Sequence, residues 1–138
     1  MKYPLYLFLL LLVSCKPEPS KPTINEFLYN NKTDYNLNLI RYITINGSTN
    51  SFSYSYKINK EGTIRINKHQ EEYLRASMLD SVVIVFENKK KIVFRNNDKQ
   101  NNPSLWGLSP IRPSSYTLIE NGEVASYTID NKIYELAK

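Results

Sequence analysis

His69 is the first residue to consider for chemistry, because it is the only histidine in the 138-residue chain. A histidine-based zinc site needs several nitrogen or sulfur ligands, and the chain has a single cysteine, Cys15. A Ser-His-acid arrangement would be assembled in space, but no Gly-x-Ser-x-Gly elbow accompanies His69. We therefore expect no metal, no cofactor and no catalytic residue, and a protein that is not an enzyme. An alternative to this expectation is an enzyme whose site brings together serine, acidic and His69 side chains that are far apart in the sequence.

Cys15 ends a segment with the composition of a secretory signal peptide. Lys2 is charged, the following run to Val13 is dominated by leucine, and Ser14 is small. This run is shorter than the roughly 20 apolar residues that a membrane-spanning helix needs. Residues Leu12-Val13-Ser14-Cys15 resemble the lipobox of bacterial lipoproteins. The resemblance implies that residues 1–14 are a signal peptide, that cleavage precedes Cys15, and that lipid is attached to its thiol and to the new amino terminus.

Residues 15–24 are expected to form a tether between the lipidated Cys15 and the folded domain. Pro17, Pro19 and Pro22 alternate with charged residues, a composition typical of a stiff, extended spacer. The resemblance implies a cell-envelope protein anchored in the outer membrane, because no aspartate follows Cys15. Glu18 is a single acidic residue and does not make an acidic export cluster, so both the periplasmic face and the cell surface remain alternatives for the location of the domain.

Residues 25–138 are long enough for one domain with its own core, and we expect a single β-rich domain there. The formal charge of +5 is scattered along the chain and does not form a stripe. A nucleic-acid partner is therefore not expected.

Alternation of apolar and polar residues is the main pattern of this domain, and it predicts strands. In the segment 52–58, Phe52, Tyr54 and Tyr56 share one face with Ile58, while serines and Lys57 share the other. The aromatic stripe is either core or a platform for stacking sugars. Further strands are expected at 35–42, 63–66, 81–86, 91–94, 116–119 and 124–129.

Two local irregularities are also predicted. The alternation slips at Leu39-Ile40, so a bulge is expected to carry Ile40 and Tyr42 on the inward face. Asn121-Gly122 predicts a two-residue hairpin that places Glu120 opposite Glu123. The two carboxylates would either hold a cation or form a solvated hairpin tip.

Together these patterns predict a mainly β fold, an antiparallel β-sandwich or partly open barrel of about eight strands. A short C-terminal helix is expected after Asp130, and residues 68–79 form either a short crossover helix or an irregular connection. Residues Asp80–Phe86, Tyr127–Ile129 and the pair Tyr134 and Ala137 resemble small uncharacterised β-rich envelope lipoproteins of Gram-negative bacteria. That resemblance implies the same anchored β-domain and no particular activity.

The best candidate for binding is the segment 96–114, which has no periodic pattern. It contains the only tryptophan, Trp106, and Arg112 between two prolines. Both residue types are favoured anchors at interfaces. The segment is either a functional loop or a cap in which Trp106 closes an open end of the sandwich. Lys89-Lys90-Lys91 is a second candidate, either for an anionic membrane surface or as a charged hairpin tip.

The function expected from these features is a non-enzymatic binding or structural module, anchored to the membrane by lipid, with a protein or glycan partner. The alternative is an immunity or inhibitor lipoprotein that neutralises a toxin or protease.

Overall fold

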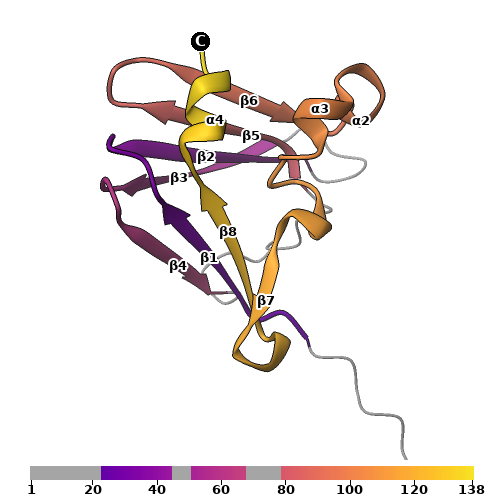
Figure 1. Ribbon diagram of the computed structural model, residues 1–138. Coiled ribbons are helices and arrows are strands. Elements are labelled where there is room, and N and C mark those ends of the chain that lie inside the picture. The colour runs from indigo at the N-terminus through magenta and orange to yellow at the C-terminus, as the bar shows by residue number, and fades with distance from the viewer. Residues whose placement is uncertain (1–22, 45–50, 68–78) are drawn as a thin grey trace, which may run out of the picture.

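The computed structural model describes residues 23–44, 51–67 and 79–138 (Figure 1). Cys15, most of the tether, His69 and the crossover expected at 68–79, except its last residue, lie outside these described residues. The chain enters the described part at residue 23, beside the turn that joins the last two strands, where the backbone N–H of Asn25 donates to the carbonyl of Glu123 over 2.8 Å.

Eight strands and a few short helices make up the described part of the chain. In order they are β1 (Glu26–Asn31), β2 (Leu37–Thr44), β3 (Ser51–Ile58), β4 (Thr63–Asn67), β5 (Leu79–Phe86), β6 (Lys91–Arg95), α2 (Asp98–Asn101), α3 (Pro103–Trp106), η2 (Pro113–Ser115), β7 (Thr117–Ile119), η3 (Glu120–Gly122), β8 (Val124–Ile129) and α4 (Asn131–Leu136).

The predicted sandwich is confirmed. One sheet has the strand order β4-β1-β8-β7 and the other has the order β3-β2-β5-β6. In β1, β5 and β6, every second side chain points between the two sheets and is buried, as the alternation requires. The core is a single cluster from both sheets that includes Tyr29, Leu39, Ile84, Phe94 and Ile129, each with no measurable exposure.

The antiparallel prediction is wrong for one pair of strands. β1 and β8 lie parallel, with Glu26 beside Val124 and Asn31 beside Ile129. β1 itself was not predicted, although it is an interior strand bonded to β4 on one side and to β8 on the other. A parallel neighbour cannot be reached by a tight turn, so the pair joins opposite ends of the domain sequence.

The inward face of β2 also differs from the prediction. The register of β2 against β3 is continuous, and the register shift against β5 lies between Tyr42 and Ile43, not at Leu39-Ile40. Consequently Arg41 points into the core, with no measurable exposure, while Tyr42 is 37% exposed. The aliphatic stem and planar head of arginine make this tolerable: its guanidinium carbon lies 5.7 Å from the centre of the Phe27 ring.

The short C-terminal helix is confirmed as α4. The Asp130 side chain caps it by accepting from the backbone N–H of Ile133 over 3.2 Å, and Ile133 and Ala137 are buried. In Figure 1, α4 and the α2–α3 segment lie at the end of the domain opposite to η3 and residue 23. The two ends of the sandwich therefore form separate surfaces.

Candidate binding site

The segment 96–114 is ordered by two short helices that the sequence did not indicate. The carboxylate of Asp98, which is buried, accepts from the backbone N–H of Arg95 over 2.7 Å. Pro103 begins α3, and the side chain of Asn102 accepts from the N–H of Leu105 over 3.3 Å. These local bonds turn the chain around the end of β6 and leave α3 next to that strand.

Three tyrosine hydroxyls attach residues 108–110, which follow α3, to the core. Tyr127 donates to the carbonyl of Leu108 over 2.5 Å, and Tyr116 donates to the carbonyl of Pro110 over 2.6 Å. Because Tyr116 has already used its proton, Tyr29 is the donor in the 3.0 Å contact between their hydroxyls. Burial raises the pKa of both Tyr116 and Tyr127, so these hydroxyls stay protonated as donors.

The two predicted binding residues lie in different surroundings. Trp106 is half-buried and packs against the hydrophobic core, as do Leu105 and Leu108, and nearby Ile111 is fully buried. This placement favours the cap over a free loop. Arg112 is partly exposed and begins the turn at η2. The side chains of Trp106 and Arg112 make no hydrogen bond or ring contact with each other, and a binding role for either stays a prediction.

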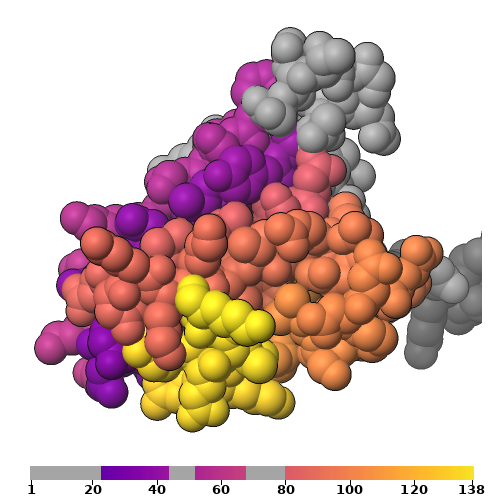
Figure 2. Space-filling view, turned by 90° about the horizontal axis from the view of Figure 1, so that it is seen from above, coloured from indigo at the N-terminus to yellow at the C-terminus, as the bar shows by residue number. Residues whose placement is uncertain are grey.

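An open groove of about 890 Å³ lies between β6, α3, α4 and the C-terminal residue. Its lining combines basic, small polar and aliphatic residues, namely Lys91, Ile92, Val93, Arg95, Asn102, Ser104, Leu105, Gly107, Leu108, Lys132, Leu136 and Lys138. Figure 2 looks onto this end of the molecule, with α4 in yellow between the β5–β6 hairpin and the orange α2–α3 segment.

The charged side chains that line the groove are all basic. Lys91, Arg95, Lys132 and Lys138 contribute four cations, and no aspartate or glutamate side chain is among the lining residues. All four are exposed to solvent, and Leu136 beside them is 47% exposed. Such a lining attracts an anionic group and also offers apolar surface to whatever carries it.

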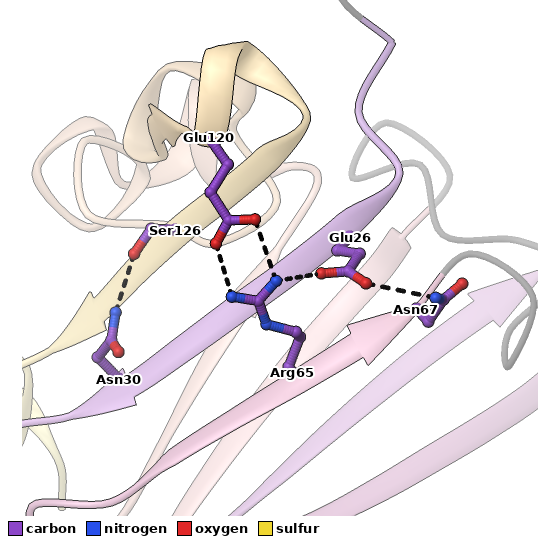
Figure 3. Close-up of polar contacts among 6 residues, drawn as sticks. All are labelled: Glu26, Asn30, Arg65, Asn67, Glu120 and Ser126. Carbon is purple, nitrogen blue, oxygen red and sulfur yellow. Dashed lines mark hydrogen bonds and ion pairs between the residues drawn. The ribbon is translucent and has the colours of Figure 1, made fainter.

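A second hollow, at the other end of the domain, is lined by one cation, Arg65, and by the carboxylates of Glu26, Glu120 and Glu123. Arg65 on β4 bonds Glu26 on β1 over 2.5 Å and Glu120 in η3 over 2.7 Å, and Asn67 bonds Glu26 over 3.3 Å (Figure 3). Arg65 donates hydrogen bonds to the carboxylates of Glu120 and Glu26, which raises the pKa of Arg65, and the bond from Arg65 lowers the pKa of Glu120. The cluster therefore links β4 to β1 and to the η3 turn, and its single cation, Arg65, is already paired with two carboxylates.

The expected pairing of Glu120 with Glu123 is wrong. β7 and β8 are joined by four residues, since Ile119 pairs with Val124, and Asn121 has a φ of 58°. The chain turns through η3 and not through a two-residue hairpin, so the two carboxylates are not cross-strand partners. Among the described residues, no group of three or more histidine, cysteine, aspartate or glutamate side chains is placed to hold a metal ion.

Lys89-Lys90-Lys91 does not form one basic patch. The Lys90 ammonium lies 4.6 Å from the centre of the Tyr134 ring, while Lys91 lines the groove and Lys89 lines a separate hollow. The aromatic stripe on β3 is divided too. Tyr54 and Tyr56 pack against the core, and Phe52 is 45% exposed.

Sequence reasoning missed the groove because its cations are far apart in the chain. Lys91 was noticed only as part of a lysine run, whereas Arg95, Lys132 and Lys138 are single charges in otherwise ordinary segments. One signal was available: Lys91 and Arg95 are spaced to share the outward face of a short edge strand. Lys132 and Lys138 join them only through the position of α4.

In the described part of the chain, no helix has both the length and the apolarity required to cross a membrane. Comparisons of the chain with protein-family models, with curated proteins and with solved structures found no match.

Proposed function

We propose that this protein is a non-enzymatic binding module of the cell envelope, anchored by lipid on Cys15, and that its β6–α3–α4 groove receives an anionic partner. The observation that carries the proposal is the groove itself, where four cations meet without an acidic side chain. Complementary charge increases the rate of encounter with an anionic partner and disfavours cationic ones. The aliphatic lining supplies the surface that a stable contact buries.

The geometry also suits a domain held by its amino terminus. The described chain begins beside η3, and β6, α3 and α4, which border the groove, lie at the opposite end (Figure 1). A ten-residue tether over 15–24, extended as a polyproline helix, spans roughly 30 Å at about 3.1 Å per residue. In this proposal the groove faces away from the anchoring bilayer, toward a partner in the adjoining aqueous space.

The experiment is a binding titration with poly-L-glutamate at physiological ionic strength. The double variant Arg95→Glu/Lys132→Glu replaces two attractions by two repulsions, each worth about 0.5–1 kcal/mol at an exposed site. We expect at least a tenfold loss of affinity, and a steep dependence of the native protein's affinity on salt. The matched control is Lys60→Glu, an exposed lysine in the β3–β4 turn, which should change affinity less than twofold.

Equal binding by the double variant and the native protein, with both folded, would refute the groove as the binding site. The immunity or inhibitor alternative is the case in which the partner is a toxin or protease with an acidic surface. It is distinguished by a protein partner that binds tightly and loses its activity on binding.

A further inference from the structure

The floor of the groove includes the open edge of a β-sheet. β6 is the outermost strand of its sheet and bonds only β5 in the strand order. Two backbone hydrogen bonds show which residues of β6 face β5. The N–H of Phe86 donates to the carbonyl of Lys90, and the N–H of Asn96 donates to the carbonyl of Asp80. Ile92 and Phe94 consequently direct their backbone groups toward β5, and Lys91, Val93 and Arg95 direct theirs outward.

Two of the three outward N–H groups already have partners within the domain. The N–H of Lys91 donates to the carbonyl of Lys138 over 2.8 Å, and the N–H of Lys138 donates back over 3.0 Å. At the other end, the N–H of Arg95 donates to the carboxylate of Asp98. Val93 lies between Lys91 and Arg95 and lines the groove. Among the described residues, no group forms a hydrogen bond with its outward N–H or C=O.

We propose that the ligand of the groove is an extended acidic peptide segment that adds to the edge of β6 at Val93. This proposal rests on the proposed function and names the class of its partner. One ligand residue exchanges two backbone hydrogen bonds with Val93, as Lys138 does with Lys91. The side chain of this ligand residue shares the face of Lys91, Val93 and Arg95, so it carries the carboxylate. Its apolar neighbours on either side point to the opposite face of the strand.

A peptide fits these features better than an anionic lipid does. A backbone N–H and C=O side by side are complementary to another peptide unit, whereas a lipid phosphate is only an acceptor and leaves the C=O of Val93 without a donor. The position of the groove, away from residue 23, also separates it from the anchoring bilayer in the proposed arrangement. An anionic membrane is therefore an outcome that the experiment must detect, not the partner we infer.

The test uses a short peptide that alternates glutamate and valine, blocked at both ends, and the same peptide methylated on its backbone nitrogens. Methylation keeps every charge and side chain but removes the donors that a strand needs. We expect the methylated peptide to bind at least tenfold more weakly.

The variant Val93→Pro makes the same test from the side of the protein. It removes the outward N–H of Val93 without removing a β5–β6 ladder bond, since proline is tolerated on the open side of an edge strand. It should bind the unmethylated peptide about three- to tenfold more weakly than Val93→Ala does, because Val93→Ala shortens the same side chain but keeps the N–H. Thermal unfolding of each variant checks that the domain is folded.

If the methylated peptide and Val93→Pro bind as the native pair does, strand addition is refuted. The proposed function still stands if the Arg95→Glu/Lys132→Glu variant loses affinity, and fails if that variant does not. Binding to phosphatidylglycerol vesicles but not to the peptide would also overturn the inference, in favour of a membrane partner.

Discussion

Replacing Tyr127 by phenylalanine tests whether the tyrosine hydroxyls fix the α3–η2 segment to the core. The hydroxyl of Tyr127 donates to the carbonyl of Leu108 over 2.5 Å, and the side chain is only 3% exposed. Phenylalanine keeps the ring and its edge contact with Tyr29, 6.0 Å between centres, so the packing change is small. The substitution removes the hydrogen-bond donor, so the carbonyl of Leu108 is left near the core without a hydrogen bond from Tyr127.

A buried acceptor that loses its donor costs about 1–3 kcal/mol. For a domain of this size each kcal/mol corresponds to roughly 3–6 °C in Tm. We expect Tyr127→Phe to lower the free energy of unfolding in urea by that amount with an unchanged slope. Trp106 is the only tryptophan in the chain and lies in the affected segment, so its fluorescence reports the local loosening directly. Acrylamide should quench it more strongly in the variant before global unfolding begins.

The matched control is Tyr134→Phe, which removes the hydroxyl that accepts from the side chain of Asn88 over 2.7 Å at an exposed site. It keeps the stacked contact with Tyr35 and should cost less than about 0.5 kcal/mol. If Tyr127→Phe is as stable as the control and its tryptophan is no more accessible, the hydroxyl does not fix the segment, and the reasoning from buried donors is wrong.

Three further predictions follow from the charges and hydroxyls of the domain. Glu120→Gln removes a partner of Arg65 and should lower the urea midpoint slightly at neutral pH. Because the pKa of Glu120 is lowered in the folded protein, the carboxylate stabilises the fold above the ordinary carboxylate range. This contribution disappears as pH falls through the lowered pKa, where the midpoints of variant and native protein should converge. Burial raises the pKa of Tyr116 and Tyr127, so their stabilising protonated state is lost only as pH rises beyond the ordinary tyrosine range; absorbance at the tyrosinate band should show them titrating together with alkaline unfolding, and their titration in the folded protein with the exposed tyrosines would contradict this. Cys15→Ala should move the protein from the detergent phase to the aqueous phase, or leave it unprocessed, and unchanged partitioning would place the anchor elsewhere.

The sequence predicted the parts of this fold in which local patterns and burial agree. In the segment 81–86, β-branched residues on both faces indicated a central strand, and β5 is an interior strand of its sheet. The Asp130 cap and the apolar Ile133 and Ala137 likewise predicted α4, because capping is a local interaction.

The features that were missed depend on contacts between distant segments. β1 is short and next to the proline-rich tether, and its alternation is carried by only Phe27, Tyr29 and the buried polar Asn31. Arg41 reads as a surface residue, yet it reaches the core face because the strand keeps its register. The groove could not be predicted, since its cations come from β6, from α4 and from the C-terminal residue, which only tertiary packing brings together.

The interior position of β1 determines how the domain would respond to mechanical load. A pull on residue 23 acts along β1, which is paired with β4 from Asn67 to Thr63 on one side and with β8 from Val124 to Ile129 on the other. If a partner held in the groove resists from the opposite end, the force runs parallel to the strand, and both ladders are sheared together instead of being opened one bond at a time. If the domain is tethered and bound as proposed, attachment through the interior strand β1, instead of through the short edge strand β7, makes the line from anchor to partner a direction in which two ladders resist the load.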